Sequence, residues 1–414
     1  MDKIIKHRFF LGSILVGILT WLVLYLILPV IPKVLLQFET ITFIVVNYLA
    51  LILGYFVFNF KIKSSNKKKI EIQIKILICF ILVCFIFRWV DLFFVRGLSF
   101  LNDFKTNRVI NKVNFDKTNY LLILAAVLKS LYFFPFVIVY SVRTLQKKKA
   151  LVVLAYFLLT LPFIEAVLMG TRKPFLEVFC VLCFTFFSFN RTKISFQKIA
   201  FAVLSIVVLL TISMSILFIR EKKEKNNEEF YSKLLNVKYN DLLVPNQVVK
   251  NYVKDSSKNE VSRLLLVTGL HMGQYFSHGI YEFNYVMCSD SVPYTKGKYT
   301  FFVFPKFINK TNLFEKISLK NPSPRKIVYL TAFGGLYLDF RWFSILFMLF
   351  FGVFQKYCFQ ISVNFPIWRP LLMYILIINV FLPSINYIRG AGIYPLISFL
   401  LFFIFMKISV FKST

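Results

Sequence analysis

Residues 9–30 read FFLGSILVGILTWLVLYLILPV, an apolar run without a charged side chain. An α-helix rises about 1.5 Å per residue, so about 20 apolar residues cross the hydrocarbon core of a bilayer. Nine further runs of this kind follow in the 414-residue chain. They occupy residues 38–60, 75–95, 119–141, 150–169, 174–190, 199–219, 329–354, 367–387 and 391–411. The sequence therefore predicts an all-α polytopic membrane protein with about ten transmembrane helices.

The first run is predicted to be a retained span rather than a cleavable signal peptide. Lys3, Lys6 and Arg8 precede it, but it is longer than the apolar region of a signal and lacks an A-x-A site. Composition agrees with a membrane class, because 58% of the residues are hydrophobic and 52 are Phe. The net charge of +31 does not indicate a nucleic-acid partner. Much of it lies in short loops beside apolar runs, where Lys and Arg set topology and meet anionic headgroups.

One polar stretch of about a hundred residues, 220–326, interrupts the apolar runs. It divides the chain into an N-terminal membrane bundle of seven spans (1–219), a large loop (220–326) and a C-terminal bundle of three spans (327–414). Short-loop Lys and Arg are roughly twice as frequent on the side that holds both termini. We therefore expect both termini in the cytoplasm and the large loop outside. Within that loop, residues 263–287 are apolar enough to pack on the bilayer surface or on the bundle.

Two places depart from simple spans. Residues 170–174 read GTRKP and predict a tight turn between two helices, because neither Gly nor Pro continues a helix without cost. The run 329–354 opens with a glycine pair and carries Asp339 and Arg341, which predicts a broken or partly re-entrant segment.

Charged side chains at membrane depth are the first candidates for a site, because charges in spans are costly and mark a pathway, a site or a pair. Arg88 and Asp91 are spaced i, i+3 on one helix face, and Arg96 follows. They form either a structural ion pair with a headgroup anchor or an anion site. Arg172 stands at a helix start, where backbone N–H groups favour anions, although snorkelling to lipid phosphate is the alternative. The further outer-side arginines are Arg325, Arg341 and Arg389, and Glu165 and Glu177 flank the turn and could pair with Arg172 or Lys173.

Histidines of the large loop are the second candidates. If 263–287 is helical, His271, Tyr275, His278 and Glu282 share one face. An imidazole with a carboxylate one turn away suits a general base and its orienting group, and a polar stripe on an amphipathic helix fits the spacing equally well. No metal site and no cofactor are expected, because the sequence has no H-E-x-x-H, no phosphate-binding or dinucleotide glycine motif and no D-x-D pair.

Four segments together resemble the Wzy-type O-antigen and capsule polysaccharide polymerases of bacteria. They are RWVDLFFVRG (88–97), MGTRKPF (169–175), YFSHGIYEF (275–283) with KGKYTF (296–301), and YLTAFGGLYLDFRWFSILF (329–347). In that family a G-[ST]-R turn joins two spans, a Y-x-S-x-G-like helix lies in the large outer loop, and a T-x-F-G-x-x-Y-x-D-F segment opens the next span. This chain departs from the pattern at Arg341 and Trp342, where small residues commonly follow the D-F.

The resemblance implies a GT-C-like bundle in the bacterial cytoplasmic (inner) membrane, with an extracytoplasmic site beneath the large loop. It implies a metal-independent glycosyltransferase that moves a glycan from undecaprenyl diphosphate to the hydroxyl of a new lipid-linked repeat unit. The partners would be that lipid-linked oligosaccharide, membrane lipid, and a chain-length regulator and flippase of the same pathway, with no nucleic acid and no cofactor.

Within this interpretation each candidate has a role. Arginines suit a diphosphate because the guanidinium fork matches phosphate oxygens in pairs. The expected diphosphate ligands are Arg172, Arg88, Arg96, Arg325 and Arg389. The expected catalytic groups are His278 or His271 beside the acceptor, with Glu282 or Asp339 as orienting groups. The expected sugar-stacking residues are Tyr275, Tyr281 and Tyr294.

Two other functions stay open. An O-antigen ligase would share the spans, the loop and the arginines. A lipid-linked oligosaccharide flippase or another transporter would be expected to show repeat symmetry and charges near mid-bilayer, whereas the charges here gather toward the outer side.

Overall fold

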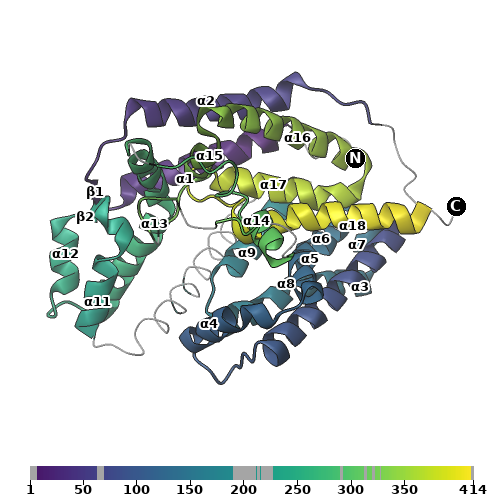
Figure 1. Ribbon diagram of the computed structural model, residues 1–414, viewed down its shortest axis with the longest axis horizontal. Coiled ribbons are helices and arrows are strands. Elements are labelled where there is room, and N and C mark those ends of the chain that lie inside the picture. Colours follow the sequence, from purple (N-terminus) through teal and green to yellow (C-terminus); the bar gives the residue numbers. More distant parts are fainter. Residues whose placement is uncertain are drawn as a thin grey trace.

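The computed structural model in Figure 1 describes residues 7–62, 70–189, 211, 215, 227–289, 292–311, 315–318, 322–326 and 328–411. The expected span 199–219, apart from residues 211 and 215, and the charge run 220–226 lie outside these residues. Helices occupy each of the other nine expected runs. Within these described residues, six helical stretches are long and apolar enough to cross a membrane. The chain is therefore an all-α polytopic membrane protein.

The N-terminal part is helical apart from one short strand. Its elements are α1 (Arg8–Ile27), β1 (Val30–Pro32), α2 (Phe38–Val57), α3 (Ile70–Trp89), the π-helix η2 (Val90–Val95), α4 (Phe104–Val113), η3 (Asn114–Lys117), α5 (Tyr120–Leu128), η4 (Lys129–Phe133), α6 (Phe134–Ser141), α7 (Arg143–Gln146), α8 (Lys149–Met169) and α9 (Lys173–Phe189). The run 119–141 is thus one span in which a 3₁₀ turn joins α5 to α6.

The loop region and C-terminal part continue this pattern. Their elements are α11 (Asn227–Leu235), η5 (Lys238–Asp241), β2 (Leu243–Pro245), α12 (Gln247–Lys254), α13 (Glu260–Met287), α14 (Val303–Thr311), α15 (Ala332–Phe340), η6 (Arg341–Phe343), α16 (Ser344–Asn364), η7 (Pro366–Trp368), α17 (Arg369–Phe381), η8 (Gly390–Ile393) and α18 (Tyr394–Phe411). The break expected in the run 329–354 is confirmed, because Arg341 has a positive φ of 49° between α15 and α16. Helix α16 then ends ten residues beyond the expected boundary.

Helices α2 and α16 pack along each other with close backbones (Figure 1). A Cβ on Gly54 would lie 2.0 Å from the carbonyl oxygen of Leu349, and one on Gly352 would lie 2.2 Å from that of Leu51. Only glycine fits at either position. The pair follows the small-residue rule of membrane helix packing, in which missing side chains let two backbones approach.

The large loop is tied to the bundle. Strands β1 and β2 form an antiparallel pair in which Val30 faces Pro245. Helix α13 packs against α1, and the indole N–H of Trp21 donates to the carbonyl of Ser277 at 3.1 Å. The carboxamide oxygen of Asn284 accepts from the amide of Gln37 and the hydroxyl of Thr40. Of the two locations predicted for 263–287, the structure therefore selects the bundle.

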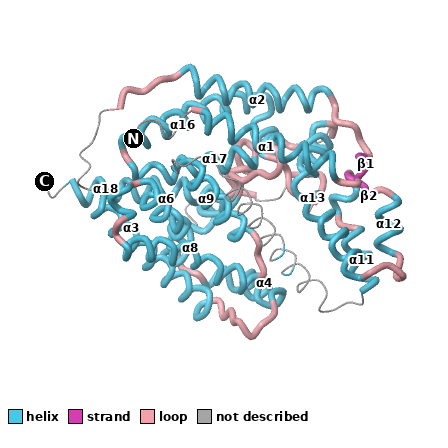
Figure 2. Tube along the Cα trace, turned by 180° about the vertical axis from the view of Figure 1, so that it is seen from behind, coloured by secondary structure: helices cyan, strands magenta, loops and turns pink. Residues whose placement is uncertain are grey.

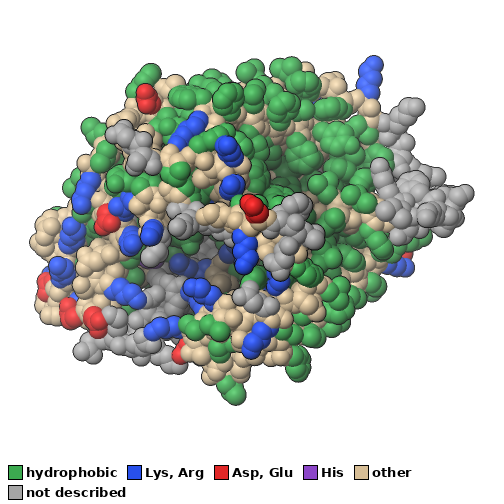
Figure 3. Space-filling view, in the orientation of Figure 1, with side chains coloured by type: hydrophobic (Ala, Val, Ile, Leu, Met, Phe, Trp, Pro, Cys, Tyr) green, Lys and Arg blue, Asp and Glu red, His purple; other side chains and the backbone are tan. Residues whose placement is uncertain are grey.

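Charge is distributed unevenly over the molecule. Figure 2 shows α11, α12 and α13 at one end and α3 and α18 at the other. In Figure 3 hydrophobic side chains cover most of the surface over α2, α16 and α18, as lipid contact requires. Lys and Arg gather instead over the α11–α13 end and around a central hollow (Figure 3).

Candidate functional site

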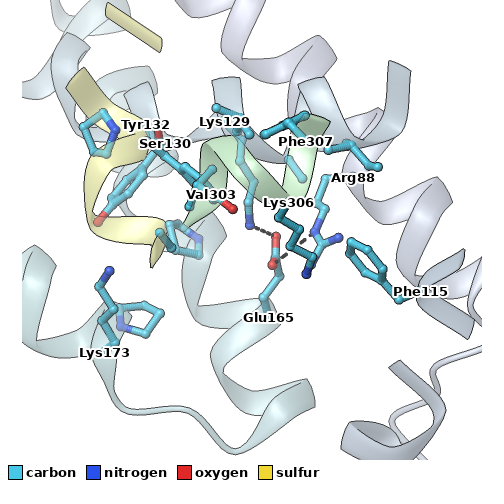
Figure 4. Close-up of a pocket in the computed structure, with 18 of the residues that line it drawn as sticks. Arg88, Phe115, Lys129, Ser130, Tyr132, Glu165, Lys173, Val303, Lys306 and Phe307 are labelled. Atoms are coloured by element: carbon cyan, nitrogen blue, oxygen red, sulfur yellow. Dashed lines mark hydrogen bonds and ion pairs between the residues drawn. The ribbon is translucent and has the colours of Figure 1, made fainter. Parts of the chain in front are cut away.

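A cavity of about 630 Å³ lies between α3, α5, α8, α9, α14 and α18 (Figure 4). Apolar side chains make up much of its wall, among them Phe85, Ile123, Val127, Phe302 and Phe307. Its cationic lining residues are Arg88, Arg96, Lys129, Lys173, Lys306 and Lys310, and its acidic lining residues are Glu165 and Glu177. A space with apolar walls and an excess of cations suits an amphipathic anion.

The π-helix η2 brings both arginines of the RWVDLFFVRG segment to one carboxylate. The amide of Arg96 donates to the carbonyl of Asp91, five residues back, at 2.9 Å. The backbone hydrogen bond therefore joins residue i+5 to residue i, whereas in an α-helix it joins residue i+4 to residue i. The π-helix thus places the side chains of residues i and i+5 on the same face. As a result Asp91 Oδ2 accepts from Arg88 at 2.6 Å and from Arg96 at 2.8 Å. The expected Arg88–Asp91 pair is confirmed, and Arg96 joins it.

Glu165 is the second carboxylate that binds the cavity cations. It forms an ion pair with Lys129, and its Oε2 lies 3.4 Å from Arg88 Nε (Figure 4). The partners expected for Glu165 were Arg172 or Lys173, and this part of the prediction is wrong. Lys129 and Glu165 are the only charged residues in their respective runs, 119–141 and 150–169. Each therefore finds its counter-charge in a neighbouring helix.

Helix α14 contributes two further cations. Lys306 Nζ and Lys310 Nζ lie 3.9 Å and 5.0 Å from the centre of the Phe115 ring, and Arg96 approaches the same ring at 5.1 Å. Lys310 also donates to the carbonyl of Thr118 at 2.7 Å. The aromatic face stabilises nearby cations. Three positive groups from two segments therefore meet at one wall of the cavity.

Asp339 holds the loop that leads into α14. Its carboxylate is fully buried and accepts from the backbone amides of Tyr299 and Thr300 at 2.9 Å and 2.7 Å and from the hydroxyl of Thr295. These contacts engage both oxygens. Asp339 therefore fixes the segment that carries Lys306, and it does not line the cavity.

The GTRKP turn links the cavity to the large loop. Gly170 ends α8 with φ of 56°, and Arg108 donates to the carbonyl groups of Met169 and Gly170, each at 2.8 Å. Lys173 then begins α9 and lines the cavity (Figure 4). Arg172 turns the other way, toward α13, where its guanidinium lies 5.9 Å from the centre of the Tyr275 ring.

The histidines of α13 are buried on the side of the bundle. His278 is fully buried, and its Nδ1 lies 2.8 Å from the carbonyl of Gln274. Burial lowers the pKa of His278 to about 4, so the imidazole is neutral at pH 7. His271 is also buried. His271 and His278 therefore share one face of α13, as predicted, and this face packs against the rest of the protein.

Glu282 and Arg325 form the shortest ion pair among the described residues of the loop region. Arg325 Nε lies 2.8 Å from Glu282 Oε2, and Arg325 Nη2 lies 3.2 Å from Asp241 Oδ2. Glu282 is 1% exposed. Burial raises its pKa to about 7, and the charge of Arg325 opposes that rise. This pair ties α13 to the segments on either side of it.

The structure brings only part of the predicted site together. Of the predicted residues, Arg88 and Arg96 line the cavity. Arg389 instead donates to the carbonyl of Tyr299, Tyr281 is buried beside Tyr25, and Tyr294 is exposed. The catalytic roles of the histidines, Glu282 and Asp339 stay predictions. Sequence reasoning missed Lys129, Lys306 and Lys310, and only Lys129 carried a signal, as a lone charge inside an apolar run.

Comparison with protein-family models, with curated proteins and with solved structures finds no match for this chain. Among the described residues no group of three or more His, Cys, Asp or Glu side chains could hold a metal ion. The side chains that line the cavity are therefore the basis for inferring which ligand it binds.

Proposed function

We propose that this chain polymerises undecaprenyl-diphosphate-linked oligosaccharide repeat units into O-antigen or capsular polysaccharide at the outer face of the bacterial cytoplasmic membrane. The observation that carries the proposal is the cavity itself, with six cations, two carboxylates and apolar walls. A polyprenyl diphosphate has the matching chemistry, since it joins a hydrocarbon chain to two phosphates.

The leaving group explains the excess of cations. Transfer of the glycan breaks the bond between the anomeric carbon and the diphosphate, and negative charge grows on the departing oxygen. Lys129 and Arg88 are held by Glu165, and Arg88 and Arg96 by Asp91, so these cations are positioned before substrate arrives. Preorganised charges of this kind stabilise a transition state without reorganising during the reaction.

The apolar wall of the cavity favours a donor that carries a lipid chain. Ile123, Val127, Phe302 and Phe307 supply a surface on which the first isoprene units pack. A water-soluble nucleotide sugar would leave this surface without a partner. The proposal therefore places the diphosphate among the cations and the start of the prenyl chain along α5 and α14.

The test is reconstitution of the purified protein in liposomes with a synthetic undecaprenyl-diphosphate repeat unit as the sole substrate. A ladder of polymer products is expected, because one molecule serves as donor and another as acceptor. Lys173→Met should reduce the ladder at least tenfold, since Lys173 lines the cavity. Lys254→Met, a change at an exposed lysine of α12, is the matched control and should leave it unchanged.

Two outcomes would overturn the proposal. One is a wild-type protein that binds the lipid diphosphate yet forms no bond between repeat units. In that case, transfer of the glycan only to an added lipid A core would point to a ligase, and movement of the intact lipid across the bilayer would point to a flippase. The other is a Lys173→Met variant with a wild-type ladder, which would leave polymerisation in place and remove this cavity as its site.

A further inference from the structure

The cavity holds two carboxylates with different surroundings. Glu165 is bound to Lys129 and Arg88. Glu177 lies on α9 one turn after Lys173, is 8% exposed and lines the same cavity. Among the residues that the structure describes, no donor lies within hydrogen-bond distance of the Glu177 carboxylate. A buried carboxylate without a partner is costly, and such groups concentrate at functional sites.

The groups around Glu177 come from four segments. Lys129 and Tyr132 of η4, Tyr374 of α17 and Tyr387 of the segment after α17 are near enough to interact electrostatically with Glu177. Cys180 and Lys173 share its own helix. The hydroxyl groups of Tyr132 and Tyr387 are buried and have no hydrogen-bond partner among the described residues. Two unsatisfied hydroxyls and a carboxylate that lines the cavity thus lie in one neighbourhood, and a polar ligand would satisfy all three groups.

The surroundings of Glu177 are separate from the wall of the cavity at which Arg96, Lys306 and Lys310 meet. Figure 4 shows Tyr132 and Lys173 on one side and Arg88 and Phe115 on the other, with Glu165 between Lys129 and Arg88. Glu177 follows Lys173 by four residues, so both lie on the same face of α9. The cavity therefore presents a proton acceptor beside Lys173 and apart from Arg88 and the cations around Phe115, as a transfer between two substrates requires.

We propose that Glu177 is the general base of the glycosyl transfer, an inference that rests on the function proposed above. The hydroxyl of the incoming repeat unit would donate its proton to Glu177 while its oxygen bonds to the anomeric carbon of the donor glycan. The bond from that carbon to the diphosphate breaks, and the electron pair leaves with undecaprenyl diphosphate, which the cations hold. The protonated Glu177 then returns its proton to water.

The roles of the two carboxylates can be separated by matched variants, Glu177→Gln and Glu165→Gln. Loss of a general base lowers the rate about 10²–10⁴-fold. Glu177→Gln should therefore lower kcat by about that factor and leave the binding of a fluorescent undecaprenyl diphosphate and the melting temperature unchanged. Glu165→Gln should instead raise KM, because Lys129 and Arg88 lose the group that positions them.

Two further readouts distinguish a base from a structural carboxylate. Glu177→Ala should recover activity with added formate, which supplies a carboxylate in the vacated space. Glu177→Asp should retain part of the rate.

The results that overturn the inference differ from those that overturn the proposed function. If the wild type forms polymer and Glu177→Gln forms it at the same rate, Glu177 is not the base and the function stands. If Glu177→Gln loses lipid-diphosphate binding or melts lower, and Glu177→Ala is not rescued by formate, the carboxylate is structural. A wild-type protein that forms no polymer removes both proposals.

Discussion

The cavity and the α13 region both hold buried arginines and carboxylates, yet the two regions leave different charges unmatched. In the α13 region one arginine, Arg325, faces two carboxylates, Glu282 and Asp241. In the cavity six cations face two lining carboxylates, with Asp91 behind them. The first set has no excess of cations, and it holds helices together. Among the described residues that line the cavity, the second set has an excess of cations, which an anionic ligand would balance.

The contrast between the two regions indicates how a charged residue at membrane depth should be interpreted. The free-energy cost of burying a charge marks both regions as candidate sites, because any buried charge is costly. What separates a structural pair from a binding site is the charge that remains after the internal partners have been counted. The predictions below test that separation.

The largest expected effect belongs to the α13 region. Arg325→Met leaves Glu282, which is 1% exposed, without its cation. Removal of one partner from a buried pair costs about 3–5 kcal/mol. We therefore expect a strongly lowered melting temperature in detergent at pH 7.5, together with unchanged binding of undecaprenyl diphosphate by the folded fraction.

The control for this variant is the double change Glu282→Gln with Arg325→Met, which removes both charges and should recover most of the lost stability. Reduced lipid-diphosphate binding by folded Arg325→Met protein would contradict the comparison. It would support the original expectation that Arg325 holds the diphosphate.

The pH dependence of stability is the next effect in size. Burial raises the folded-state pKa of Glu282 from 4.5 to about 7. A raised pKa means that the folded protein binds the proton more tightly, so the contribution is present below pH about 4.5 and is lost as pH rises through about 7. The loss is about 3 kcal/mol.

Glu282→Gln mimics the protonated side chain and isolates this contribution. The stability difference between the variant and the wild type should be small at pH 5 and should grow toward pH 8, with the variant the more stable of the two. Melting curves at these pH values provide the measurement. A difference that does not change with pH would contradict the assignment.

The sequence predicted the helices well because lipid imposes one dominant rule on them. Runs of apolar residues become helices of similar length, and the GTRKP turn and the break near Asp339 follow from glycine, proline and charge. The exact end of α16 was missed by ten residues, since the sequence continues in a helix-compatible way beyond the apolar run. The count of ten spans stays a prediction.

The candidate site was harder to predict because its parts come from separate segments. The Arg88–Asp91 pair follows from i, i+3 spacing, whereas Arg96 joins it only through the π-helix. No periodicity indicates that Lys306 of α14 faces Phe115 of η3. The large-loop histidines shared a face as predicted, but the sequence did not indicate that this face packs into the bundle.

The smallest effect concerns Lys306, an exposed lysine at the rim of the cavity. Solvent screens its charge, so Lys306→Met should cost about 1 kcal/mol in donor binding, a roughly fivefold weaker Kd. The melting temperature should change little, because Lys306 is exposed to solvent. Titration of liposome-reconstituted protein with fluorescent undecaprenyl diphosphate measures the affinity.

Lys298→Met is the matched control, since Lys298 is an exposed lysine of the same loop that does not line the cavity. Equal weakening by both variants would mean that general surface charge attracts the lipid and that the cavity cations have no special part. Weakening by Lys306→Met alone, set beside intact binding in Arg325→Met, would show that the cavity cations bind the ligand and that the Arg325–Glu282 pair holds the fold.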